Sequence, residues 1–323
     1  MYLTSNHIYF LGKLFTTDLD GTILIGAKDN IKRNLKDRSY DTHSFKKTFS
    51  TVKRKGFDDV LINTGRNFSE LSEIKELLQD TDAPINAISL EDGKRLLKKP
   101  LNLTPEQWMA QLFGGKVNYT YFCDKNWEDI NSAPLKQIAE FLTKEMGYIH
   151  RKNEDEKSIF SKDIEFGDVG VEKISGNPKW RVEIIPPGIT VKVKVYNKGD
   201  SKINLQEYNS YLSSKVLNFL ERKGYDISKL KSEEETCYIN KFKRADINKK
   251  TVADFFKSTL PDDTQEIRAG NASNDYEMLN DDSIQAIVVG DDEHLKRKLA
   301  GKSNITYVEE GHLDKGIRLA LRA

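Results

Sequence analysis

The sequence has few cysteines, no long apolar run and almost no net charge. Its 323 residues include only two cysteines, Cys123 and Cys237, which are too few and too far apart for a disulfide framework or a zinc site. No run approaches the roughly 20 apolar residues of a membrane-spanning helix. The 51 Lys and Arg residues are balanced by 50 Asp and Glu residues, for a net charge of +1. We therefore expect neither a nucleic-acid-binding protein nor an integral membrane protein.

The beginning of the chain, Met1 to Leu14, lacks the apolar segment and small-residue cleavage site of a secretory signal. We expect a cytoplasmic protein with two buried, reduced thiols, and export by a route without a cleavable signal stays open. A hydrophobic fraction of 37% is enough for a chain of this length to bury a core. Nothing in the sequence indicates an oligomeric state.

Apolar strands and amphipathic helices alternate at both ends of the chain. Strands are expected over 13–18, 60–64, 266–270, 286–290 and 305–308. Helical patterns lie between them, one ending at Gly56, one over 69–79 and the last over 315–321. This alternation predicts an α/β fold with a doubly wound, Rossmann-like parallel sheet. Catalytic residues of such a sheet lie at the carboxyl ends of its strands.

The middle of the chain has a different pattern. We expect helices over 105–113, 134–146 and 207–223, and strands over 117–122, 180–185, 191–196 and 236–242. The stretch 151–172 is charged and without periodicity, which indicates a long loop. The sequence therefore predicts a core formed by residues 1–97 and 242–323. An α+β domain of mainly antiparallel strands is inserted into it over 98–241.

Two carboxylates, Asp18 and Asp20, lie at the end of the first expected strand, in the run Phe-Thr-Thr-Asp-Leu-Asp-Gly-Thr-Ile. Gly21 lets the backbone turn and approach a ligand closely, and two hard oxygen donors held together favour Mg²⁺. A solvated Asp-Gly turn is the alternative explanation for that pair of residues alone. The full run favours the magnesium site.

This run resembles the first motif of the haloacid dehalogenase (HAD) superfamily of phosphatases. The resemblance implies that Asp18 is the nucleophile that accepts the phosphoryl group. It implies that Asp20 protonates the leaving alcohol and later activates water, with Gly21 and Thr22 in the phosphate-binding turn. An aspartyl phosphate divides one difficult displacement into two easier ones, and a second carboxyl group can act first as acid and then as base.

The second and third motifs of that superfamily also have counterparts. The run Leu-Ile-Asn-Thr-Gly-Arg resembles the second motif, which implies that the Thr64 hydroxyl binds the phosphoryl oxygens beside Gly65 and Arg66. The run beginning at Asp246 resembles the family's Asn-Lys-Gly motif and implies Lys249 as the motif lysine, with Lys250 as the second choice. Lys192 lies in a similar run, but a strand follows it and it is much farther from the fourth motif.

The fourth motif, residues 270–275, resembles the family's Gly-Asp-x-x-Asn-Asp, except that Asn271 replaces a metal-binding acid. An amide oxygen can still bind Mg²⁺, although less strongly than a carboxylate. We expect Asp275 to contact the metal or to orient Lys249, and Asn274 to lie beside the substrate phosphate. Together the motifs predict a magnesium site formed by Asp18, Asp20, Asn271 and Asp275.

The insert lies between the second and third motifs, as does the C2 cap of the Cof-type and sucrose-phosphate-phosphatase-like enzymes that it resembles. The resemblance implies a magnesium-dependent phosphomonoesterase that acts on a sugar phosphate or similar metabolite. Two alternatives stay open: a protein phosphotyrosine phosphatase of effector type, and a HAD-fold binding protein whose catalysis Asn271 weakens. We expect the insert to shield the phosphoryl group and select the substrate, with hinges near 93–100 and 241–247.

Overall fold

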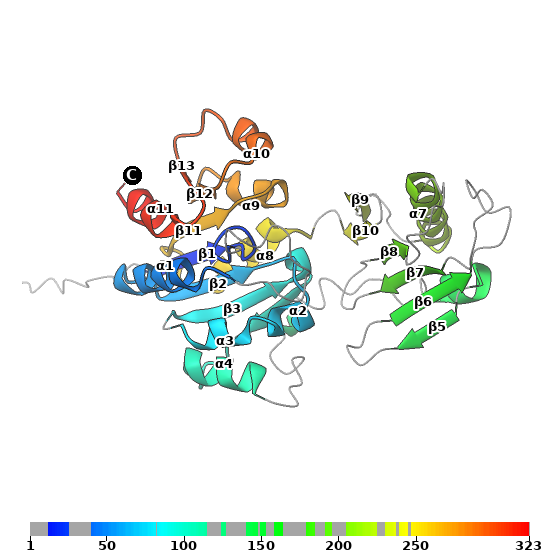
Figure 1. The fold of residues 1–323 in the computed structure, drawn as a ribbon, viewed down its shortest axis with the longest axis horizontal. Helices are drawn as coiled ribbons and strands as arrows, with labels where there is room; N and C mark the ends of the chain where they lie inside the picture. Colours follow the sequence, from blue (N-terminus) through cyan, green and yellow to red (C-terminus); the bar gives the residue numbers. More distant parts are fainter. Residues whose placement is uncertain are drawn as a thin grey trace, which may run out of the picture. The chain divides into compact units, whose positions relative to one another are not determined.

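A computed structural model (Figure 1) describes residues 12–25, 40–81, 83–114, 124–126, 140–147, 149–152, 158–163, 179–184, 191–195, 205–224, 230–236, 239–244 and 247–322. The chain divides into two compact units, Met1–Lys125 with Asn248–Ala323, and Asn126–Ile247. We call the first the core unit and the second the inserted unit. None of the described helices is long and apolar enough to cross a membrane.

The core unit is built on a seven-stranded sheet with the strand order β13-β12-β11-β1-β2-β3-β4. Its strands are β1 (Lys13–Thr17), β2 (Asp59–Asn63), β3 (Ile85–Leu90), β4 (Arg95–Lys98), β11 (Gln265–Gly270), β12 (Gln285–Val289) and β13 (Ile305–Val308). Neighbouring strands are parallel except for β3 with β4. The predicted α/β fold with a mainly parallel sheet is therefore confirmed.

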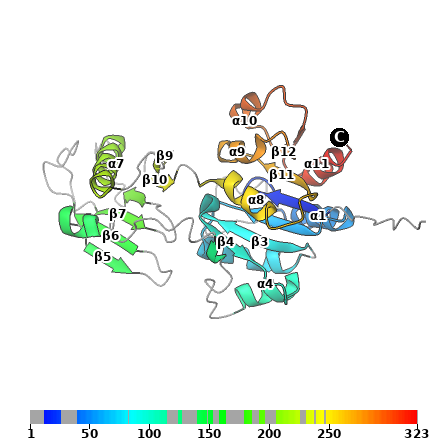
Figure 2. The ribbon, with the colours of Figure 1, turned by 180° about the vertical axis from the view of Figure 1, so that it is seen from behind.

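Helices cover both faces of this sheet (Figures 1 and 2). They are α1 (Thr42–Arg54), α2 (Phe68–Ser72), α3 (Lys75–Gln79), α4 (Pro105–Phe113), α8 (Lys249–Lys257), α9 (Tyr276–Leu279), α10 (Glu293–Lys298) and α11 (Leu313–Ala320). Alternating residues of β12 show the two faces. Ile287 and Val289 pack in the cluster that contains α1 and α11, whereas Ala286 and Val288 pack with α9 and α10. This alternation follows from the two-residue period of a strand.

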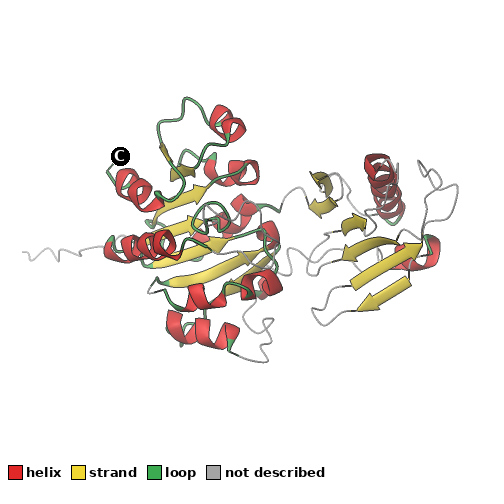
Figure 3. Cartoon of the chain, in the orientation of Figure 1, coloured by secondary structure: helices red, strands yellow, loops and turns green. Residues whose placement is uncertain are grey.

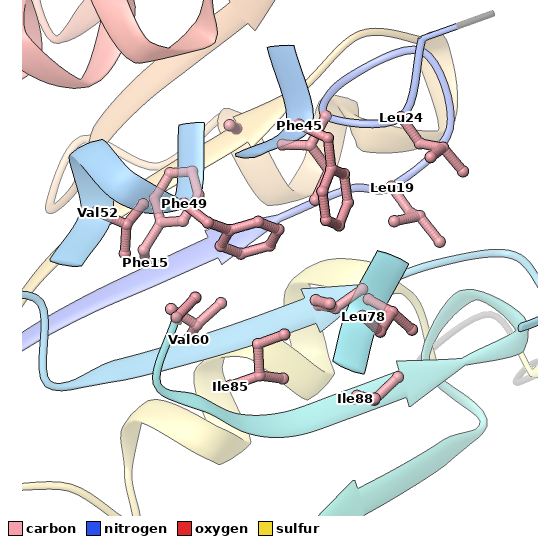
Figure 4. Close-up of a cluster of buried hydrophobic side chains, with 14 of the residues drawn as sticks. Phe15, Leu19, Leu24, Phe45, Phe49, Val52, Val60, Leu78, Ile85 and Ile88 are labelled. Atoms are coloured by element: carbon pink, nitrogen blue, oxygen red, sulfur yellow. The ribbon is translucent and has the colours of Figure 1, made fainter. Parts of the chain in front are cut away.

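Helix α1 forms because its sequence supplies both a cap and an apolar face. The side chain of Asp41 accepts hydrogen bonds from the backbone N–H groups of His43 and Ser44, which satisfies the first turn. Phe45, Phe49 and Val52 recur at helical spacing and are buried. Figure 4 shows these side chains directed toward strands β1 and β2.

The expected helix over 69–79 is two helices in the structure. Helices α2 and α3 are separated at Ile74, whose backbone (φ −113°, ψ 16°) is not helical. Ile74 is buried in the same cluster as Leu71 and Leu78. Tertiary packing at the break therefore overrides the continuous helical periodicity of the segment.

The core unit extends further along the chain than the sequence predicted. Helix α4 was expected in the insert, but its residues Trp108, Met109 and Leu112 are buried in the main core cluster. An apolar helix face does not indicate which sheet it will cover, and that is why the boundary was misplaced. The hinge expected near 93–100 is also wrong, because this stretch contains β4, a strand of the core sheet.

The inserted unit contains a six-stranded antiparallel sheet with the order β5-β6-β7-β8-β10-β9 (Figure 3). Its strands are β5 (Ile149–Lys152), β6 (Ser158–Asp163), β7 (Lys179–Ile184), β8 (Val191–Val195), β9 (Leu230–Thr236) and β10 (Ile239–Arg244). Helix α7 (Leu205–Arg222) contacts β10. The rings of Phe141 and Phe219 stack with their centroids 4.5 Å apart. The predicted α+β character with antiparallel strands is thus present.

Two predictions within this unit are corrected. The stretch 151–172 was expected to be a loop, but β6 and the end of β5 form there, because pairing with neighbouring strands does not require an apolar pattern. The single strand expected over 236–242 is the end of β9 and the start of β10, which pair antiparallel. The strand expected over 117–122 and the first part of the helix expected over 134–146, residues 134–139, lie outside the described residues, while Phe141–Glu145 are helical.

The placement of α4 in the core unit predicts a specific loss of stability. Leu112 is fully buried, so Leu112→Ala should lower the free energy of unfolding by about 2–5 kcal/mol. The matched control is Gln111→Ala, at an exposed position of the same helix. Urea denaturation followed by circular dichroism measures both changes. Equal effects of the two substitutions would contradict the packing of α4 against the core.

Candidate functional site

Three of the four sequence motifs meet at one edge of the core sheet. Strand β1 is paired in parallel with β11 on one side and β2 on the other. Asp18 follows β1, Thr64 follows β2, and Asn271 follows β11. Because the carboxyl ends of parallel strands lie at the same edge, three segments far apart in the sequence converge there.

Lys249 connects these segments. Its ammonium group donates to Asp18 Oδ1 at 2.5 Å and to Asp275 Oδ1 at 2.7 Å, and its side chain is only 2% exposed. Lys249 is the first residue of α8, and the Asn248 side chain caps that helix. The Asn63 side chain at the end of β2 donates to the Lys249 carbonyl at 2.7 Å, which fixes the start of the helix against the sheet.

The charges of this buried group depend on one another. Burial raises the pKa of Asp18 to about 7, with a further increase from the nearby Asp275, while the ammonium of Lys249 opposes the change. Burial lowers the pKa of Lys249, but Asp18, Asp275 and Asp92 raise it more, so that its net pKa is above the usual value. One cation thus serves two buried carboxylates, which leaves the group with an excess of negative charge.

The other candidate lysines lie elsewhere. Lys250 donates instead to Asp254 at 2.6 Å and to Asp281 at 2.8 Å. Lys192 belongs to β8 in the inserted unit, where it pairs with β7 and β10. The geometry therefore favours Lys249 as the lysine of the third motif.

Both carboxylate oxygens of Asp275 are already bound within the protein. Oδ1 accepts from Lys249, and Oδ2 accepts from the backbone N–H groups of Asn271 at 2.9 Å and Ala272 at 3.1 Å. Gly270 allows this arrangement, because a Cβ atom there would lie 2.6 Å from that of Asp275. Of the two roles expected for Asp275, the contacts favour the orientation of Lys249 over direct binding of a metal.

Asp20 is held by Arg66 through a two-pronged ion pair. Nε and Nη2 of Arg66 donate to the two carboxylate oxygens of Asp20 at 2.8 and 2.7 Å. The guanidinium also donates to the Tyr40 hydroxyl at 3.0 Å and to the Glu70 carbonyl at 2.9 Å. Arg66 was expected beside the substrate phosphate, but in the structure its contacts are with Asp20 and the residues that surround it.

Thr64 is fully buried, and its hydroxyl accepts a hydrogen bond from the Arg66 backbone N–H at 3.1 Å. That contact uses the oxygen of the hydroxyl and leaves its proton able to donate. Asp92 lies at the same edge: its backbone N–H donates to the Thr64 carbonyl at 3.1 Å, and its carboxylate accepts from Asn274 at 3.4 Å. Glu91 and Asp92 both have positive φ (56° and 57°), which is uncommon for residues other than glycine.

The side chain of Asn271 lies against oxygen atoms of the first motif. One terminal atom of its amide is 3.2 Å from Asp18 Oδ2, 3.0 Å from the Asp20 carbonyl oxygen and 3.1 Å from Thr22 Oγ1. Thr22 Oγ1 also donates to Asp18 Oδ2 at 3.2 Å. Asn271 is thus in contact with the nucleophile predicted from the sequence.

These atoms fit a magnesium ion in their chemistry and spacing. Mg²⁺ takes oxygen ligands at about 2.0–2.1 Å in an octahedron, so adjacent ligands are separated by about 2.9 Å. Asp18 Oδ2 and the Asp20 carbonyl lie at 3.2 and 3.0 Å from the Asn271 amide atom, close to that spacing. Within the described ranges, no three His, Cys, Asp or Glu side chains form a group that could hold a metal. A metal here would depend on one carboxylate, one carbonyl and one amide.

Three residues at this edge were not among the site residues expected from the sequence. Tyr40 contacts Arg66, Asn63 holds the start of α8, and Asp92 lies beside Thr64 and Asn274. Asn63 directly precedes Thr64, and a polar residue at the end of a buried strand was a signal that could have found it. Tyr40 carries no such signal, because it does not follow an expected strand.

The arrangement around Lys249 predicts unequal effects for two neighbouring lysines. Lys249→Met removes the cation that contacts both buried carboxylates, so the free energy of unfolding should fall by about 3–5 kcal/mol. Lys250→Met removes ion pairs that are partly exposed and should cost about 1 kcal/mol or less. Urea denaturation at neutral pH measures both, and a larger effect at Lys250 would overturn the assignment.

Several solved structures that are similar to this chain in fold are described as phosphatases. The sucrose-phosphatase from Synechocystis sp. PCC6803, in complex with sucrose and phosphate, has a TM-score of 0.51 at 12% identity, over 96% of this chain and 98% of that one. A HAD-superfamily phosphatase from Bacteroides thetaiotaomicron has a TM-score of 0.49 at 12% identity, over 100% of both chains. The trehalose-6-phosphate phosphatase from Aspergillus fumigatus has a TM-score of 0.44 at 12% identity, over 97% and 93%.

No protein-family model and no curated protein sequence matches this chain. At 12% identity, the likeness to the sucrose-phosphatase concerns the fold alone. The predicted fold class is confirmed: the chain shares its fold, with a mainly parallel α/β core sheet, with the sucrose-phosphatase.

Proposed function

We propose that this protein is a magnesium-dependent phosphomonoesterase that acts through an aspartyl phosphate on Asp18. The observation that carries the proposal is the buried ammonium of Lys249, held between Asp18 and Asp275 at the edge where Thr64 also lies. A fixed cation beside a carboxylate nucleophile is suited to a reaction in which negative charge develops on phosphoryl oxygens. The fold shared with a sucrose-phosphatase supports the same reaction class.

In the first step, a carboxylate oxygen of Asp18 attacks phosphorus, and the bond from phosphorus to the substrate oxygen breaks. Lys249 and the Thr64 hydroxyl stabilise the phosphoryl oxygens, and Asp20 gives its proton to the leaving alcohol. Mg²⁺ held by Asp18, the Asp20 carbonyl and Asn271 would supply further positive charge beside the phosphoryl group.

In the second step, water attacks the phosphorus of the aspartyl phosphate. Asp20, now a carboxylate, takes a proton from that water. The acyl phosphate bond breaks, which releases inorganic phosphate and restores the Asp18 carboxylate. The two carboxyl groups thus have different roles, and their environments differ accordingly: Asp18 is 5% exposed, whereas the Asp20 side chain is 46% exposed.

Arg66 acts in this scheme as a positioning residue for Asp20. A guanidinium fork holds both oxygens of an ionised carboxylate, which is the form that Asp20 needs to take a proton from water. A protonated carboxyl group cannot accept both hydrogen bonds of the fork. Asp20 must therefore loosen from Arg66 before it can protonate the leaving alcohol, so the ion pair affects both steps.

A sugar phosphate or a similar small metabolite is the substrate class that we propose. The support is the sucrose-phosphatase, which was solved with sucrose and phosphate. We further propose that the inserted unit, residues 126–247, is a C2-type cap that selects the leaving group. Its α+β composition and its place between Thr64 and Lys249 in the sequence are the reasons.

The proposed nucleophile predicts that Asp18→Asn lowers turnover by about 10⁴-fold or more, because an amide cannot accept the phosphoryl group. The assay measures phosphate release, with Mg²⁺, from a panel of sugar phosphates and phosphotyrosine peptides. Asp263→Asn, at an exposed carboxylate, is the control and should leave the rates unchanged.

The same panel separates the alternatives. Preference for sugar phosphates supports the proposed substrate class, and preference for the peptides would replace it with a protein substrate. Mass spectrometry of acid-quenched wild-type enzyme should find a phosphorylated peptide that contains Asp18. Wild-type rates in Asp18→Asn, or no turnover of any phosphate ester by the wild type, would overturn the proposed function.

The role of Arg66 predicts a particular kinetic change. Lysine cannot form the two-pronged contact with Asp20, so Arg66→Lys should lower kcat by about tenfold or more and shift its pH profile, with little change in KM. Arg54→Lys, on the exposed face of α1, is the control. If Arg66 instead binds the substrate phosphate, KM will rise and the pH profile will keep its shape.

A further inference from the structure

The amide of Asn271 occupies a position surrounded by oxygen atoms. Its backbone is fixed, because its N–H donates to Asp275 at 2.9 Å. Gly21 lies against the side chain with φ of +76°, and a Cβ atom at that position would overlap the amide. The side chain is therefore confined, and the main freedom left to it is the choice of which terminal atom faces Asp18.

The two choices have opposite chemistry. With nitrogen toward Asp18, the two N–H groups of the amide have three possible acceptors at 3.0–3.2 Å: Asp18 Oδ2, the Asp20 carbonyl and Thr22 Oγ1. With oxygen there, that atom faces acceptors, while the nitrogen on the other side faces only donors. The hydrogen-bonding pattern therefore favours nitrogen at this position when no cation is bound. In this orientation the partial positive charge of the amide N–H groups faces Asp18 Oδ2 and the Asp20 carbonyl oxygen.

The orientation with the amide oxygen toward Asp18 suits a site in which a cation is bound. With the amide oxygen inward, it lies 3.2 Å from Asp18 Oδ2 and 3.0 Å from the Asp20 carbonyl oxygen, close to the separation of adjacent ligands around Mg²⁺. A cation between them would remove the repulsion that disfavours this orientation in its absence. Both orientations need almost no movement of the backbone, since they differ by a half turn about the last bond of the side chain.

We propose that Asn271 is a reversible substitute for the metal, whose amide turns by half a turn when Mg²⁺ binds. Without Mg²⁺, its N–H groups donate to Asp18 and to the Asp20 carbonyl and hold these residues in place. Binding of Mg²⁺ must break these hydrogen bonds before the amide oxygen can become a ligand. The site is thus ordered without metal and is filled only at high magnesium concentration. The inference concerns Mg²⁺ binding and the orientation of the Asn271 side chain. It rests on the proposed function only for the role of that Mg²⁺ in catalysis.

The first test follows the Asn271 side-chain amide of the full-length wild type by ¹H–¹⁵N NMR. The signal is identified by its loss in Asn271→Ala, and MgCl₂ is titrated after treatment with a chelator, with NaCl at equal ionic strength as the control. We expect a fixed, hydrogen-bonded amide without metal and a different amide shift at saturation. An unchanged shift while calorimetry records Mg²⁺ binding, or no binding at high millimolar Mg²⁺, would overturn the inference.

The second test compares melting temperatures of the wild type, Asn271→Asp and Asn271→Ala, with and without Mg²⁺. After chelation, Asn271→Asp should melt lowest, because a carboxylate would face Asp18 where the amide donated. It should also gain most from Mg²⁺ and bind it about tenfold or more tightly than the wild type, since carboxylates are the stronger ligands. An Asn271→Asp protein that is as stable as the wild type after chelation contradicts the inference.

These outcomes are distinguishable from failure of the proposed function. A metal-linked turn of the amide in a protein without turnover would support the inference and refute the phosphatase. Turnover that depends on Asp18, with an amide that does not respond to Mg²⁺, would support the phosphatase and refute the inference. If Asn271→Asp folds only with Mg²⁺, that result agrees with the proposal, and the NMR titration of the wild type still decides it.

Discussion

The ammonium of Lys249 between two buried carboxylates is the interaction on which the rest of the candidate site depends. It joins the end of β1, the start of α8 and the loop after β11, although Lys249 and Asp18 are 231 residues apart in the sequence. A buried ion pair is not a large source of stability, but the loss of one partner leaves an unpaired charge in the core. The cost of that charge keeps the three segments together.

One ammonium cannot satisfy two carboxylates alone, and the remaining contacts of the site supply what it lacks. Asp275 takes two backbone N–H groups, and Asp18 takes the Thr22 hydroxyl and the Asn271 amide. Asp20 has its own cation in Arg66. A phosphate ester that approaches this edge therefore meets carboxylates whose hydrogen-bond donors and cations are already engaged. Additional positive charge is needed to bring it close, which is a physical reason to propose a divalent cation.

The sequence was sufficient for the core of this arrangement but not for its details. Alternation of strands and helices placed Asp18 and Thr64 at neighbouring strand ends, because parallel strands share their carboxyl edge. The fork between Arg66 and Asp20 could not be foreseen, since it depends on how two loops fold over that edge. The boundary of the inserted unit was missed for a similar reason. An apolar helix such as α4 carries no signal of which sheet it will cover.

Position 271 shows how a local change of charge can be independent of the fold. Asn and Asp have nearly the same shape, so the loop after β11 can keep its form with either residue. What changes is the electrostatic relation to Asp18, from a carboxylate that requires a cation to an amide that can replace one. Likeness of backbone to solved phosphatases therefore does not determine how tightly this site holds a metal. That property depends on which atom of the amide faces Asp18.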